Sequence, residues 1–199
     1  MRREYDTLLP QSHISKYVHS QEQKRTTTID YTIRGLVLYE RRHLGFSIQY
    51  PSDWIMDDKK YYNSYDDRYR QVAGLLIPSY DQPGQLREIV SIQIEYLGSH
   101  TIDFDAYTKR QIHELIARHK NAFDLILLEA AQTILANRRA HKIDYVFTYR
   151  RNNRYFRSME FWTIEKDKSY HISYESYSID YLNLLPVIEK MITSFQILV

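Results

Sequence analysis

Cysteine is absent from the 199 residues, so the chain can form neither disulfides nor thiolate metal sites. Glycine and proline occur only five times each, which excludes a collagen-like or low-complexity chain and a glycine-rich phosphate loop. No apolar run approaches the roughly 20 residues that span a bilayer, and the N-terminus lacks the apolar core of a signal peptide. As written, the chain is expected to be cytoplasmic; an upstream leader would make it extracytoplasmic.

A strong excess of one charge is also missing. The chain has 27 basic and 25 acidic residues, a net charge of +2, so no global field directs it to nucleic acid or to an anionic membrane. With 43% hydrophobic residues, a packed core is expected, and the length suits one domain. Residues 1–34 show no sustained periodicity and are predicted to be a weakly ordered extension, which leaves 35–199 as the domain.

Two segments show the alternation of a strand with one buried face. In Phe46–Tyr50 apolar and polar residues alternate until Pro51, and Trp54 follows closely enough to cover this strand. Glu88–Leu97 alternates most regularly, which predicts one face in the core and one in water. A charged, tyrosine-rich stretch over 57–71 is predicted to be a loop, and Val72–Ile77 a strand.

Two helices are expected. Asp103 or Asp105 can cap a helix that continues to about Lys120, because a carboxylate accepts the free N–H groups of the first turn. Leu182–Phe195 carries an apolar stripe typical of a second helix. Pro186 suits a first helical turn, so this helix is expected to begin near it.

Four further strands are predicted between the helices, and the last three are joined by short polar turns. This pattern is typical of an antiparallel meander, and with the flanking helices it predicts an α+β domain. The expected fold is a central antiparallel sheet flanked by helices. The predicted strands are residues 123–133, 139–149, 155–165 and 170–177.

The segment GFSIQYPSDW, from Gly45 to Trp54, together with Ile192, Ser194 and Phe195, resembles the PsbP-like family. The resemblance covers residues 36–199. It implies an α-β-α sandwich, a fold that is also found in a Ran-GTPase-binding nuclear import factor. Known members are largely extrinsic, non-catalytic subunits or assembly factors, best known at photosystem II. The resemblance therefore implies a binding or accessory protein that needs no cofactor and docks on a protein partner, including membrane-associated complexes.

Three residues form the best candidate for a metal-dependent enzyme, which is the first alternative. His141, Asp144 and His171 are residue types that bind metals, and they would need the fold to bring them together. No HExxH motif and no His pair at i, i+4 is present. Paired acids such as Asp103 and Asp105 are interpreted as capping and solubilising groups.

Basic and aromatic side chains cluster in one predicted hairpin and suggest a surface that binds an acidic partner. Arginine forks bind carboxylates and phosphates, and aromatic rings support cation–π contacts or base stacking. Binding of single-stranded nucleic acid is therefore a further alternative. A second tyrosine-rich segment outside the predicted strands adds interface candidates. The hairpin residues are Arg150, Arg151, Arg154, Tyr155 and Arg157, and the tyrosines are Tyr61, Tyr62, Tyr65 and Tyr69.

Overall fold

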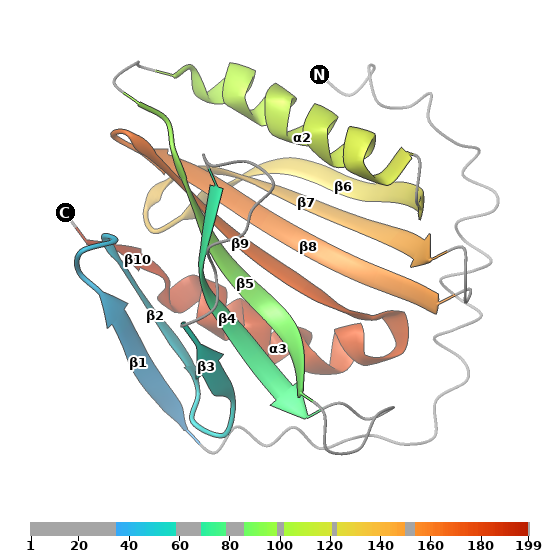
Figure 1. Cartoon of the computed structure of the whole chain (residues 1–199), viewed down its shortest axis with the longest axis horizontal. Coiled ribbons are helices and arrows are strands. Elements are labelled where there is room, and N and C mark those ends of the chain that lie inside the picture. Colours follow the sequence, from blue (N-terminus) through green and yellow to red (C-terminus); the bar gives the residue numbers. More distant parts are fainter. Residues whose placement is uncertain are drawn as a thin grey trace.

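A computed structural model describes residues 35–58, 69–78, 86–98, 102–120, 123–149 and 154–198. Within them lie two long helices and ten strands, in the order shown in Figure 1. They are β1 (Leu36–Arg41), β2 (Phe46–Pro51), β3 (Ile55–Asp57), β4 (Tyr69–Pro78), β5 (Leu86–Tyr96), α2 (Phe104–Lys120), β6 (Phe123–Leu135), β7 (Arg138–Tyr149), β8 (Arg154–Glu165), β9 (Lys168–Tyr177), α3 (Ser178–Ser194) and β10 (Gln196–Ile197).

The strands form two antiparallel sheets. The large sheet has the order β3-β4-β5-β9-β8-β7-β6, and the small one has the order β1-β2-β10. The predicted meander is confirmed, because β6, β7, β8 and β9 pair with their neighbours in chain order. The helices lie on opposite faces of the large sheet (Figure 1), so the expected α+β architecture with a central antiparallel sheet is correct.

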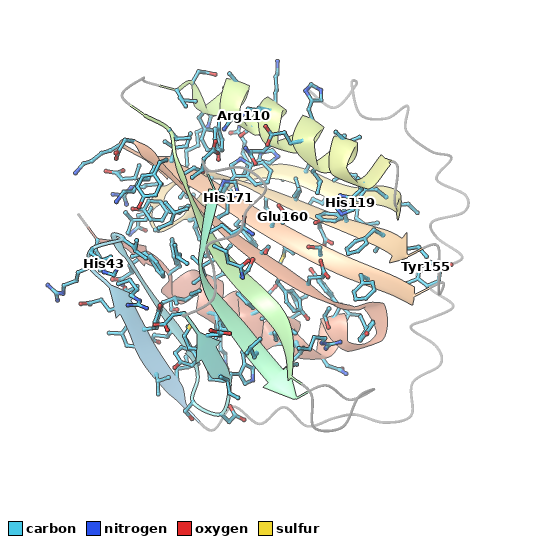
Figure 2. The ribbon with its side chains drawn as sticks, in the orientation of Figure 1. His43, Arg110, His119, Tyr155, Glu160 and His171 are labelled. Atoms are coloured by element: carbon cyan, nitrogen blue, oxygen red, sulfur yellow. The ribbon has the colours of Figure 1, made fainter. Side chains whose placement is uncertain are left out.

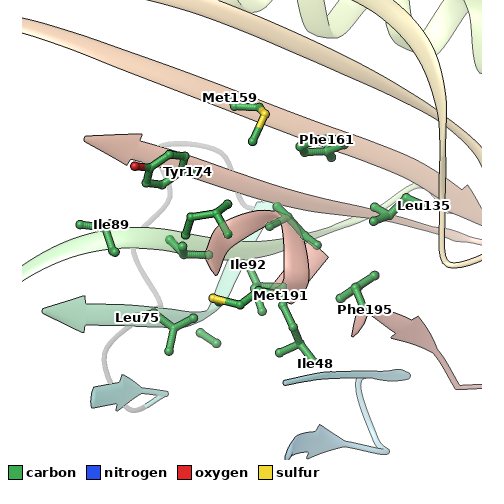
Figure 3. Close-up of a cluster of buried hydrophobic side chains, with 14 of the residues drawn as sticks. Ile48, Leu75, Ile89, Ile92, Leu135, Met159, Phe161, Tyr174, Met191 and Phe195 are labelled. Carbon is green, nitrogen blue, oxygen red and sulfur yellow. The ribbon is translucent and has the colours of Figure 1, made fainter. Parts of the chain in front are cut away.

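Each face of the large sheet has its own hydrophobic core. On one face, α3 packs between the large sheet and β2, and Figure 3 shows Ile48 of β2, Met191 of α3 and Ile92 of β5 in this cluster. On the other face, Leu115 of α2 packs with Trp162 of β8 and neighbouring aromatic residues. Trp54 is partly buried against the first core, as its position after β2 predicted.

The expected N-cap of α2 is confirmed for Asp103. The backbone N–H of Ala106 donates to Asp103 Oδ1 at 2.8 Å, so the carboxylate satisfies one free donor of the first turn. Asp105 lies within that first turn. The second expected helix starts earlier than predicted, because α3 begins at Ser178 and Pro186 lies inside it. Pro186 is exposed, so α3 carries its proline on the solvent side of the helix.

Two expectations about strands are wrong. The alternation of Glu88–Leu97 predicts that the polar face with Glu95 is in water, yet the Glu95 side chain is only 1% exposed. The face that carries it is covered by α2, which the alternation of β5 alone does not reveal. The loop predicted over 57–71 is too long, because Tyr69 already pairs with Glu95 as the first residue of β4.

Candidate functional site

His141, Asp144 and His171 do not form a common site. His141 and Asp144 are three residues apart on β7, so their side chains point to opposite faces of the sheet. His141 and His171 lie on the α2 face on either side of Trp162, with ring centroids 5.0 and 6.1 Å from it. Among the residues that the structure describes, no three His, Asp or Glu side chains are grouped to hold a metal ion.

Asp144 instead forms an ion pair with Arg157 on the α3 face. Arg157 Nε and Nη2 donate to the two carboxylate oxygens at 2.9 and 2.7 Å. The guanidinium also lies over the ring of Tyr181, 4.4 Å from its centroid. Burial, with the negative charge of Asp144 as a smaller cause, raises the pKa of Tyr181 well above its ordinary value. Arg157 therefore points inward and joins β7 and β8 to α3, away from the hairpin surface suggested by the sequence.

A buried polar network connects α2 to the sheet, and Figure 2 labels two of its members, Arg110 and His171. The Tyr107 hydroxyl lies 2.6 Å from both Glu95 Oε2 and His171 Nε2. Arg110, one turn further along α2, donates to both oxygens of Glu95 at 2.7 and 2.9 Å. Its guanidinium also lies 4.8 Å from the centroid of the Tyr107 ring. The network thus neutralises a carboxylate that α2 removes from water.

The geometry determines which atoms donate. The phenol of Tyr107 has one proton and donates it to Glu95, so His171 donates its Nε2–H to the Tyr107 oxygen. Ser169 Oγ lies 3.0 Å from the same nitrogen and can accept as well. Carboxylate, phenol and imidazole in series could relay a proton, but all three side chains are buried. The arrangement therefore fits a lock between α2 and the sheet.

Sequence reasoning missed this network, although a signal was present. Tyr107 and Arg110 are three residues apart on a helix, so they share a face. Glu95 is the charged residue among the polar side chains of β5 that face α2. A carboxylate in this position needs a cationic partner, and a basic residue of the helix can supply it. His141 belongs to the same interface: it packs on Trp162, and burial lowers the pKa of its imidazole.

The basic hairpin lies at the end of the sheet where β7 passes into β8. Arg150 and Arg151 lie outside the described residues, and Arg154 opens β8 opposite Tyr149. Tyr155 is 37% exposed and is labelled at this end of the sheet in Figure 2. The structure therefore leaves an aromatic side chain at the surface here.

Stacked rings support this end of the sheet on the α2 face. Phe156 stacks on Phe147 with a centroid separation of 5.4 Å and contacts Tyr177 at 4.7 Å. These ring contacts join β7, β8 and β9 at the end of the sheet that carries Tyr155. The other predicted aromatic surface is not described in full: Tyr61, Tyr62 and Tyr65 lie outside the described residues, and Tyr69 belongs to β4.

No family model matches the sequence, and no curated protein does either. Solved structures do match. Cyanobacterial PsbP from Synechocystis aligns over 86% of this chain and 98% of its own, with a TM-score of 0.58 at 12% identity. The chain has the PsbP/Mog1-like fold. LpqN of Mycobacterium tuberculosis aligns over 87% of this chain and 99% of its own (TM-score 0.55, 11% identity), and the Ran-binding protein Mog1p of Saccharomyces cerevisiae over 82% and 95% (0.51, 9%).

The fold that the PsbP-like resemblance implied is therefore confirmed by structures from three different organisms. At 9–12% identity these matches establish the PsbP/Mog1-like fold of the chain, and function has to be argued from its own residues. None of the helices in the described ranges is long and apolar enough to cross a membrane.

Proposed function

We propose that the chain is a non-catalytic binding domain that docks on a protein partner through the hairpin between β7 and β8. The observation that carries the proposal is Tyr155, an exposed aromatic side chain at the start of β8, next to the basic segment 150–154. Tyrosine and arginine are the residue types that contribute most to protein interfaces.

Two further observations support binding over catalysis. Two of the three groups that the sequence suggested for chemistry are engaged in structural contacts, since Asp144 is paired with Arg157 and His171 with Tyr107. The fold is shared with Mog1p, a Ran-binding protein, and with LpqN, which is involved in cell envelope biogenesis. Both support an accessory role in which the surface of the domain, and no reaction centre, carries the function.

The partner surface is expected to be acidic, because the hairpin places Arg150, Arg151 and Arg154 within five residues. The test replaces these three arginines by glutamate and measures which proteins co-purify with the tagged full chain. We expect partner recovery to fall at least about tenfold, since each reversed charge meets like charge across the interface. Tyr155→Ala is expected to weaken the same association without changing the net charge.

A matched control reverses the same amount of charge elsewhere. Lys109, Lys166 and Lys190 are exposed, and their replacement by glutamate should leave the association intact. Equal loss in both triple variants would show a nonspecific charge effect and contradict the hairpin proposal, as would unchanged binding in the arginine variant. Recovery of single-stranded nucleic acid with a steep salt dependence would assign the hairpin to that ligand and contradict the proposal too.

A further inference from the structure

Among the residues that the structure describes, strand β1 forms one edge of the small sheet. Within the described part of the chain it pairs only with β2, so alternate residues direct their backbone N–H and C=O groups away from the sheet. Figure 1 shows β1 at the margin of the molecule. Its first three residues are apolar and exposed: Leu36 and Val37 are each 38% exposed and Leu38 is 61% exposed. An apolar edge of this kind is prone to pair with another strand.

The other edge strands of the described residues are interrupted or short. Strand β6 has an irregular register between Leu127 and Glu129, which divides its edge into two shorter parts, and the exposed Glu129 carries a charge there. Strands β3 and β10 contain three and two residues, which is too short for stable pairing. Strand β1 has six residues in uninterrupted register with β2, without proline, lysine or a bulge.

We propose that β1 pairs with β1 of a second copy of this chain, in antiparallel orientation about a two-fold axis at Leu38. The two small sheets would then form one six-stranded sheet in the order β10-β2-β1-β1-β2-β10. This inference is independent of the hairpin proposal, because it concerns the other sheet. It follows the general preference of soluble oligomers for two-fold symmetry, in which one patch serves both copies.

Charge excludes an axis at either charged residue of β1, and the exposure of Leu38, 61%, favours this residue among the rest. In an antiparallel two-fold pair, a residue on the axis lies opposite itself, so an axis at Glu40 or Arg41 would bring like charges together. An axis at Leu38 pairs five residues without such repulsion: Leu38 meets Leu38 of the second copy, and Leu36 lies opposite Glu40. Arg41 is already engaged, because its guanidinium donates to Asp58 and to Tyr39 Oη.

The contact area of one strand pair is small, so the dimer is expected to be reversible, with a dissociation constant on the order of 10–100 µM. Analytical ultracentrifugation of the full chain across this range tests the prediction. Leu38→Lys should raise the dissociation constant at least about tenfold, because it brings two ammonium groups together at the axis. The exposed position of Leu38 allows this change without disturbing the core.

The matched control is Ile134→Lys, which introduces the same charge at an exposed apolar residue of the β6 edge. It should leave self-association unchanged. A dimer that Leu38→Lys does not weaken, or that Ile134→Lys abolishes, would overturn the proposal. So would a chain that remains monomeric throughout the concentration range.

The absence of cysteine allows a direct test of register. A single Leu38→Cys substitution introduces the chain's one thiol, so any disulfide formed under mild oxidation joins two copies. The two Cα atoms at the axis would be about 4.5–5.5 Å apart, within disulfide reach. Leu36→Cys should not crosslink, because residue 36 of one copy and residue 36 of the other lie about four residues apart along the strands, roughly 13 Å. Crosslinking at position 36 and not at 38 would contradict the register.

Discussion

Gly45 illustrates why one residue of the β1–β2 turn must be glycine. Its φ of +83° lies in the left-handed region, and a Cβ atom there would come within 2.8 Å of Tyr170 Oη and 3.4 Å of the Leu198 carbonyl oxygen. Its carbonyl accepts the backbone N–H of Leu198 at 2.8 Å. The residue therefore joins the turn to β9 and to the C-terminal segment, and both its backbone angle and its surroundings exclude a side chain.

Gly45→Ala is expected to lower the free energy of unfolding by about 2 kcal/mol, since backbone strain and the clash with Tyr170 add. Gly98→Ala is the matched control: its φ is +75°, but apart from its chain neighbours no atom of the described residues lies within 4 Å of the added Cβ. It should cost about 1 kcal/mol, from backbone strain alone. Urea denaturation of both variants measures the difference, and equal losses would show that the approach of Tyr170 is unimportant.

At the scale of elements, α2 is attached to the sheet by two different kinds of contact. Near its start, Tyr107 and Arg110 reach the buried Glu95 through hydrogen bonds. Further along, Leu115 is buried in the second core and His119 lies 5.3 Å from the Phe147 ring. The polar contacts fix the position of the helix along the sheet because hydrogen bonds are directional, while the contacts in the second core bury its apolar face.

Tyr107→Phe removes the hydroxyl that both Glu95 and His171 contact. It is expected to lower the free energy of unfolding by about 2 kcal/mol, because two buried polar groups lose a partner. Hydrogen exchange followed by mass spectrometry should show that the variant exchanges faster than the wild type in α2, with a smaller change in β7 and β8. Tyr96→Phe, at an exposed tyrosine of the same sheet, should change stability by less than about 0.5 kcal/mol. Unchanged exchange in α2 would mean that the network does not hold the helix.

For the whole molecule, buried tyrosines are distributed over both cores. Burial raises the pKa of Tyr170 to about 12, and it raises those of Tyr145 and Tyr181 as well. Tyr145 also donates to Glu160 at 2.6 Å, and the charge of that carboxylate disfavours the phenolate further. These side chains pack as apolar groups only while they remain protonated.

Alkaline pH should therefore destabilise the fold. The folded-state pKa values are raised, so the contribution of these tyrosines is constant below about pH 10 and is lost as the pH rises from 10 toward 12. In this range each buried tyrosine lowers the free energy of unfolding by up to about 1.4 kcal/mol per pH unit. Urea denaturation at pH 8, 10 and 11 measures this slope, and Tyr170→Phe should reduce it. A slope that the variant leaves unchanged would contradict the assignment of Tyr170.

Spacing alone already argued against a joint site of His141 and Asp144. A strand alternates sides at each residue, so the three-residue separation of His141 and Asp144 already places them on opposite faces of β7. The partners of the two residues were not readable, because Trp162 and Arg157 lie on the next strand and meet them through the register between β7 and β8.

The sequence by itself determined most strands of the large sheet, the meander, and a carboxylate cap at Asp103 or Asp105 before α2. Each of these depends on the local geometry of the backbone, which a period of two residues or a carboxylate before a helix is enough to indicate. Only the tertiary structure decided that α2 buries Glu95 and that β1 is left as an edge. Both depend on which distant segments lie over or beside a strand, and local periodicity carries no information about that.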